Sequence, residues 1–190
     1  MSSVTQSDDR RALDDARAGS LEAFERLVGQ HAPRLIRFCY HLTGSWDEAR
    51  EAAQESFARA WSCLHQYDAS RPFAPWLLTI ASRLVAARQL SRRRREQAES
   101  QEAHPRTAPI SIERSLALKE ALARLTPHQR QAVVLCDLHG FSATEAARMI
   151  GCTGSTVRVL RFLARQRLRR ELDAAATLTR IPEVSPERTP

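Results

Sequence analysis

The sequence lacks the short motifs that identify the common soluble enzymes. It contains no HExxH zinc motif, no glycine-rich phosphate loop and no Gly-x-Ser-x-Gly nucleophile turn. Its six histidines are scattered along the chain instead of lying in one motif. We therefore expect no catalytic chemistry, and an enzyme such as a nuclease or a helical hydrolase is the least favoured class.

Cysteine is sparse, and its spacing argues against both disulfides and zinc. No CxxC pair occurs, and no cysteines and histidines follow zinc-finger spacing. Isolated reduced thiols of this kind are typical of a cytosolic protein. We predict neither a metal nor a cofactor. The four residues are Cys39, Cys63, Cys136 and Cys152.

Long apolar runs are missing too. The longest is far short of the roughly 20 residues that span a bilayer, and the first ten residues are too polar for a secretory signal. We expect a cytoplasmic protein with no membrane insertion of its own.

The alternation of apolar and polar residues that marks a strand is absent, and apolar residues recur instead at spacings of three and four. A polar segment containing Pro105 and Pro109 has no periodicity and reads as a linker. The predicted fold is all-α, with two small helical domains joined by a flexible linker. The predicted bounds are 10–95 for the first domain, 96–112 for the linker, 113–173 for the second domain and 174–190 for a loose tail.

Positive charge is what the chain has in excess. Its formal net charge is +7 and its pI is about 10.2, and Lys119 is the only lysine among 29 basic residues. This balance favours a polyanionic partner.

Residues 142–168 have the pattern of a helix-turn-helix. Ser142 and Glu145 form a capping box for a first helix, and Gly151 supplies the positive φ that ends it. Thr153 then caps a second helix. Because the second helix of such a motif enters the major groove, we expect this domain to bind duplex DNA.

The second helix of this motif divides into a buried stripe and a basic outer face. Its apolar stripe consists of Val157, Leu160, Ala164 and Leu168. No acidic residue occurs over 146–170. An ordinary helical hairpin with a solvated basic face is the alternative. The predicted DNA contacts are Thr153, Ser155, Thr156, Arg158, Val159, Phe162, Arg165 and Arg169.

A helix predicted over 47–64 carries acidic residues on one side. Without further evidence, this acidic side is well explained as a surface that faces solvent. The residues, here called the acidic face, are Asp47, Glu48, Glu51, Gln54 and Glu55.

The next predicted helix, 75–95, is basic and follows a loop that contains Tyr67 and Phe73. Positive charge beside exposed aromatic rings suits stacking on unpaired bases. The alternative is that the end of this helix happens to be basic and does not bind nucleic acid. The basic residues are Arg83, Arg88, Arg92, Arg93, Arg94 and Arg95.

Three segments, 49–61, 73–95 and 125–158, together resemble bacterial RNA polymerase sigma factors of the extracytoplasmic-function (ECF) group, in that family's order. The resemblance implies that the acidic face docks on core RNA polymerase. It also implies that the loop and basic helix bind and open the minus-ten element, and that the helix-turn-helix reads the minus-thirty-five element.

The expected function is therefore that of a sigma factor, which directs core polymerase to specific promoters in response to a stress or envelope signal. The implied partners are core RNA polymerase, promoter DNA and an anti-sigma factor wedged between the two domains.

The sequence departs from the family pattern at two places. Arg83 and Ala87 replace the asparagine and aspartate that the family often has in the minus-ten helix. Val159, Leu160 and Arg161 replace a polar pair and a leucine in the recognition helix. We expect Leu160 to take over the packing, and the minus-thirty-five element to be read with more apolar contact.

The alternative function is that of a conventional helix-turn-helix regulator that binds duplex operator DNA without polymerase. Against it, the amino-terminal half shows no ligand-pocket pattern and has a basic helix of its own.

Overall fold

The computed structural model describes residues 3–98 and 113–178, which are helical almost throughout and contain no strand. The predicted all-α fold with two helical domains is confirmed. The linker falls mostly on 99–112, outside the described residues, and its first three residues prolong a helix. Within the described part, no helix is long and apolar enough to cross a bilayer.

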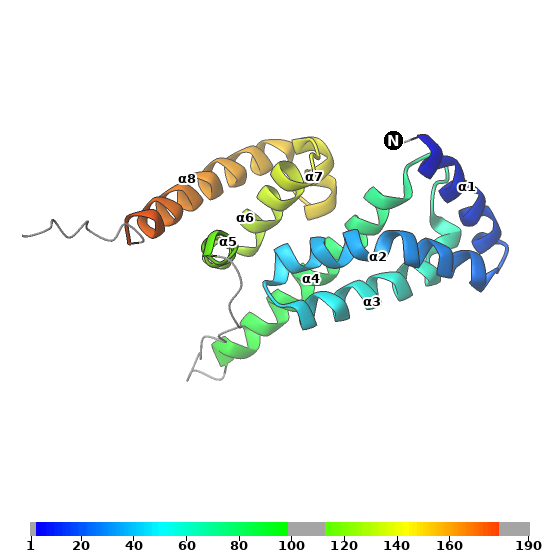
Figure 1. The fold of residues 1–190 in the computed structure, drawn as a ribbon, viewed down its shortest axis with the longest axis horizontal. Coiled ribbons are helices and arrows are strands. Elements are labelled where there is room, and N and C mark those ends of the chain that lie inside the picture. Colours follow the sequence, from blue (N-terminus) through cyan, green and yellow to red (C-terminus); the bar gives the residue numbers. More distant parts are fainter. Residues whose placement is uncertain (1–2, 99–112, 179–190) are drawn as a thin grey trace, which may run out of the picture.

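The first domain consists of four α-helices and one short 3₁₀ turn (Figure 1). Ser20 caps the second helix by accepting a hydrogen bond from the amide of Ala23, and Pro33 is accommodated inside that helix. The elements are α1 (Ser3–Arg17), α2 (Leu21–Thr43), α3 (Trp46–Ser62), η1 (Leu64–Gln66) and α4 (Phe73–Ala98).

Small residues on α3 let this helix approach its neighbours closely. Ala49, Ala53 and Ala60, which recur at helical spacing on one side of α3, are fully or almost fully buried. In contrast, the apolar side chain of Leu90 on α4 is 52% exposed. The reason is that α4 continues past the end of α2: Gln89 already contacts the last turn of α2 through the carbonyl of Leu42.

The second domain contains the expected helix-turn-helix. Ser142 and Glu145 form a complete capping box, and Gly151 ends the first helix of the motif at φ 85°. Ala174 and the residues up to Leu178 belong to the last helix, so the predicted start of the tail is wrong. Three consecutive alanines, strong helix formers, explain the extension. The elements are α5 (Glu113–Ala123), α6 (Pro127–Val133), the π-helix η2 (Val134–Leu138), α7 (Ala143–Ile150) and α8 (Gly154–Leu178).

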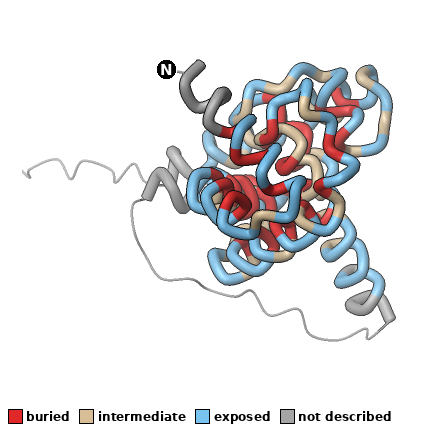
Figure 2. The backbone as a smooth tube through the Cα atoms, turned by 90° about the vertical axis from the view of Figure 1, so that its right-hand side faces the viewer, coloured by how far each residue is buried: buried red, intermediate tan, exposed pale blue. Residues whose placement is uncertain are grey.

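The two domains share one apolar interior. Buried residues of α2, α3 and α4 form a single cluster with buried residues of α6, η2 and α7, and Figure 2 shows buried segments alternating with exposed ones along the helices of the folded part. Phe38 of α2 packs edge-on against His139, with ring centroids 5.0 Å apart. Burial, reinforced by the charges of Arg34 and His41, lowers the pKa of His139 to about 4. The ring is therefore neutral at this contact near pH 7.

Hydrogen bonds across the interface fix the orientation of the domains. The amide of Gln131, buried on α6, donates to the carbonyl oxygen and hydroxyl of Ser82 on α4, at 3.0 and 3.1 Å. The Arg130 guanidinium donates to the Leu42 carbonyl at 2.7 Å. Because Gln131 and Ser82 are buried away from water, losing either of these partners is costly.

The two domains pack against each other, and this arrangement is here called closed. We predict that Gln131→Ala loosens it. Leaving the Ser82 groups without their donor should cost about 1–3 kcal/mol, so the radius of gyration measured by small-angle scattering should increase. Gln30→Ala, an exposed substitution on α2, is the matched control and should leave it unchanged. An unaltered radius for Gln131→Ala would show that apolar contacts alone hold the domains together.

Candidate nucleic-acid and protein interfaces

The acidic face lies along α3, where Ser45 caps the helix by accepting a hydrogen bond from Glu48. Three of its carboxylates, those of Glu48, Glu51 and Glu55, turn toward α4. Glu48 pairs with Arg92 at 3.5 Å, and Glu51 approaches Arg88 at 3.8 Å. Sequence reasoning placed these acids and arginines in two separate interfaces, whereas the structure makes the two surfaces neighbours.

Glu55 is the most engaged residue of the acidic face. It accepts hydrogen bonds from Arg88 and, at 2.6 Å, from Arg59. Its partial burial acts to raise the pKa of this carboxyl, but the two arginines outweigh burial and hold the pKa below its usual value. Glu55 is therefore ionised at neutral pH and partly neutralises Arg88. Asp47 and Gln54 remain exposed on the same helix.

The basic residues of α4 have different surroundings along the helix. Arg83 donates to the carbonyl oxygen of Arg148 on α7 at 3.1 Å, so a predicted minus-ten contact touches the helix-turn-helix. Arg88 and Arg92 face α3, and Arg94 is exposed. The side chains of the predicted contacts Arg93 and Arg95 lie outside the described residues.

The prediction that Tyr67 and Phe73 are exposed stacking surfaces is wrong. They are 3% and 2% exposed, respectively. Phe73 packs on His31 at a centroid distance of 5.2 Å, and the Tyr67 hydroxyl donates to the carbonyl of Arg71, closing the loop. Local sequence showed two aromatic residues in a loop, but tertiary packing turned both inward.

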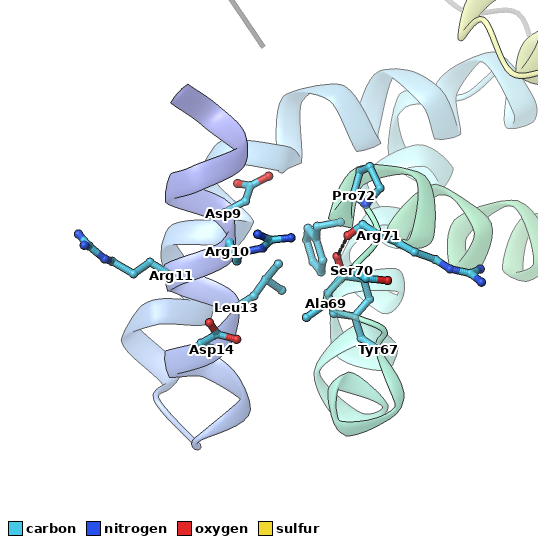
Figure 3. A pocket seen from close by; sticks show the side chains of 11 residues that line it. Asp9, Arg10, Arg11, Leu13, Asp14, Tyr67, Ala69, Ser70, Arg71 and Pro72 are labelled. Atoms are coloured by element: carbon cyan, nitrogen blue, oxygen red, sulfur yellow. Dashed lines mark hydrogen bonds between the residues drawn. The ribbon is translucent and has the colours of Figure 1, made fainter. Parts of the chain in front are cut away.

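A cavity of about 560 Å³ lies where this loop faces α1 (Figure 3). Tyr67 and Phe73 form part of its lining, together with Ser70 from the loop and Asp14 from α1. Figure 3 shows Arg10 of α1 extending toward the loop.

Sequence reasoning missed the contribution of α1 to this cavity. Asp9 lies just outside the predicted domain and contacts His31 at 3.2 Å, and both residues are buried. Their separation of 22 positions leaves no local signal of the contact. His31, one of the six scattered histidines, is therefore an interior residue of this domain.

The recognition helix α8 begins at a cluster of hydroxyl groups. Thr153 accepts a hydrogen bond from the amide of Thr156 at 3.2 Å, and its hydroxyl lies 2.8 Å from those of Ser155 and Thr156. Ser155, Arg158, Val159 and Phe162 follow on the exposed side and are here called the reading face.

The expected shift of the apolar stripe on α8 is confirmed. Val157 and Ala164 are fully buried, and Leu160 packs against the core. Arg161, at the family's leucine position, lies beside the stripe and donates to Asp137 on η2. The predicted DNA contact Arg165 binds the same carboxylate at 2.5 Å, whereas Arg169 is exposed farther along α8.

Asp137 is thus the acceptor that joins η2 to α8. Burial acts to raise its pKa, but hydrogen bonds from Arg165 and Arg161 outweigh burial and lower it. The ionised carboxylate holds the flank of the recognition helix while the reading face stays open.

Comparisons with known proteins identify the family of this chain. Residues 27–96 match Sigma-70 region 2, and residues 115–168 match Sigma-70 region 4. The chain is 32% identical to the ECF RNA polymerase sigma factor SigM of Mycobacterium tuberculosis over 166 residues, covering 82% of this chain and 80% of SigM. The chain belongs to the ECF RNA polymerase sigma factors. This sigma factor is also 32% identical to BldN of Streptomyces coelicolor over 84% of its own length.

The chain spans 64% of the length of BldN, less than two thirds of that relative. Among solved structures, it resembles the sigma factor RpoE from Bartonella quintana, solved in complex with the anti-sigma factor NepR. The TM-score is 0.67 and the identity 27%, covering 80% of this sigma factor and 98% of RpoE.

We predict that Glu55→Gln increases the affinity of this sigma factor for single-stranded DNA. Removing the carboxylate takes away the shorter of the two acidic contacts of Arg88 and leaves only the longer one to Glu51. Arg88 can then make one additional phosphate contact, which should steepen the salt dependence by about 0.7. Fluorescence anisotropy with a labelled oligonucleotide over a salt series measures both quantities. Glu25→Gln makes the same change in net charge at an exposed position on α2. Equal shifts for the two variants would indicate net charge rather than release of Arg88.

Proposed function

We propose that this chain binds core RNA polymerase and directs it to specific promoters to initiate transcription, acting in the cytoplasm in response to a stress or envelope signal. The observation that carries the proposal is that one chain combines an arginine-rich recognition helix with a second basic helix beside an acidic face. Polymerase supplies the chemistry, and this chain supplies the choice of promoter.

The acidic face is the proposed contact with polymerase. Asp47, Glu51 and Gln54 offer polar groups to a partner, while Phe57 is buried beneath them and anchors α3 to the domain. Glu48 and Glu55 would exchange Arg92 and Arg88 for polymerase groups when the complex forms. Docking on polymerase would thereby release the arginines for DNA.

The cavity between α1 and the loop is the proposed site for an unpaired base of the minus-ten element. Its volume lies in the range of ordinary ligand sites, and Arg10 and Ser70 provide hydrogen-bond donors in its lining. Tyr67 and Phe73 would act as its apolar wall rather than as exposed stacking rings. The arginines of α4 would hold the strand phosphates, which helps to offset the cost of unstacking a base.

In the closed arrangement the two domains cannot bind both promoter elements at the same time. Elements centred about 25 base pairs apart are separated by about 85 Å of duplex at 3.4 Å per base pair. In the structure α4, the proposed minus-ten helix, touches the helix-turn-helix directly through Arg83 and the carbonyl of Arg148. We therefore propose that the domains separate on the promoter and that binding of an anti-sigma factor, as seen for RpoE, keeps them inactive.

In vitro transcription with core polymerase tests the proposal. Wild-type protein should give defined start sites on a promoter library, and Glu51→Arg should weaken core binding by roughly tenfold, the scale of one interfacial charge. Glu51 is well exposed, so the variant should fold. Glu25→Arg is the control for reversed charge and should bind core normally.

Two outcomes would contradict this assignment. Specific binding to duplex DNA without polymerase, together with no polymerase-dependent start sites, would identify a conventional regulator. Normal core binding by Glu51→Arg would remove the acidic face from the polymerase interface.

Promoter reading by α8 gives a second prediction. Arg158→Ala should cost about 1–3 kcal/mol and relax the preference at one base pair, because arginine contacts guanine bidentately. Arg169→Ala should weaken all sequences alike and reduce the salt slope by roughly one. Activity across a library of minus-thirty-five variants separates the two cases. If Arg158→Ala lowers every variant by the same factor, Arg158 binds phosphate.

A further inference from the structure

Two large apolar side chains occupy the middle of the reading face. Val159 is 57% exposed and Phe162 is 60% exposed, whereas Val157 and Ala164 on the opposite side of α8 are fully buried. The exposure is a consequence of helix phase: at 100° per residue, Val159 and Phe162 lie opposite the packed stripe. Their position predicts that a partner covers them.

The charges around this apolar pair indicate the chemistry of that partner. At 100° per residue Arg158 lies to one side of it, and Arg170 lies to the other side about two turns farther along the helix. The first acidic residue of α8 is Glu171. A surface that is apolar in the middle and cationic at its edges is complementary to the major groove. There, thymine methyl groups line the floor and phosphates form both rims.

We infer that Val159 and Phe162 select thymine by contact with its C5-methyl group, at positions of the minus-thirty-five element next to the base pair read by Arg158. The inference rests on the proposed promoter function and specifies the sequence class that α8 prefers. The two side chains are about 4.5 Å apart along the helix axis. One base step is about 3.4 Å, so they reach the same or neighbouring base pairs.

This mode of reading differs from hydrogen-bonded recognition in a measurable way. A methyl contact adds affinity for thymine without involving the pairing edge, whereas Arg158 requires the acceptors of guanine. Removing one buried methyl group corresponds to about a fourfold loss of affinity. The thymine preference should therefore be moderate at each position, and independent of the guanine preference.

Replacing thymine by uracil isolates this contact, because the two bases differ only in the methyl group. The experiment uses this sigma factor with core polymerase on the most active promoter of the minus-thirty-five library. Each thymine of that element is replaced singly by uracil, and promoter binding is measured. We expect a loss of about fourfold at one or two positions beside the Arg158-dependent base pair.

Protein variants then show which side chains are responsible. Val159→Ala and Phe162→Ala should each bring the thymine-to-uracil ratio close to one at one of these positions. Leu172→Ala truncates another apolar residue of α8, 37% exposed and beyond the reading face, and should leave every ratio unchanged.

The outcomes distinguish this inference from the proposed function. If transcription remains promoter-specific but uracil replaces every thymine without effect, the methyl contact is wrong and the proposed function stands. The same conclusion follows if Val159→Ala and Phe162→Ala keep the wild-type ratios but lose affinity for a protein partner. If the chain directs no transcription with core polymerase, both the function and this inference fail.

Discussion

The packing of α2 against its neighbours is the interaction on which the arrangement of this protein depends. This helix packs against α1, α3 and α4 within its own domain and against α6 and η2 of the second domain. Phe38 is fully buried, and the carbonyl of Leu42, at the end of the helix, accepts hydrogen bonds from Gln89 of α4 and Arg130 of α6. The same surface therefore stabilises the first domain and holds the second domain in place.

This shared interior connects stability to function. Apolar burial favours the closed form, and Gln131 adds directional bonds to Ser82 that only one orientation satisfies. Under the proposed function, promoter binding requires the domains to separate, so contacts that stabilise the free protein oppose that activity. The ion pair between Arg88 and Glu55 likewise opposes the proposed activity. It must break before Arg88 can bind DNA or Glu55 can bind polymerase.

The sequence was sufficient to predict the features that depend only on residues close together in the chain. The capping box at Ser142 and the left-handed Gly151 defined helix ends that the structure confirms. The shift of the packing stripe to Leu160 was also predictable, because helix phase depends only on spacing. The exposed half of α8, which carries the proposed DNA contacts, follows from the same phase.

The sequence by itself thus determined the helices, their buried faces, the helix-turn-helix and the family. Tertiary structure alone decided how these parts meet. Tyr67 and Phe73 turned inward, Asp9 joined His31 across 22 positions, and the acidic and basic faces became partners. The physical reason is range: capping and helix phase act within a few residues, whereas burial and ion pairing depend on which distant surfaces exclude water together.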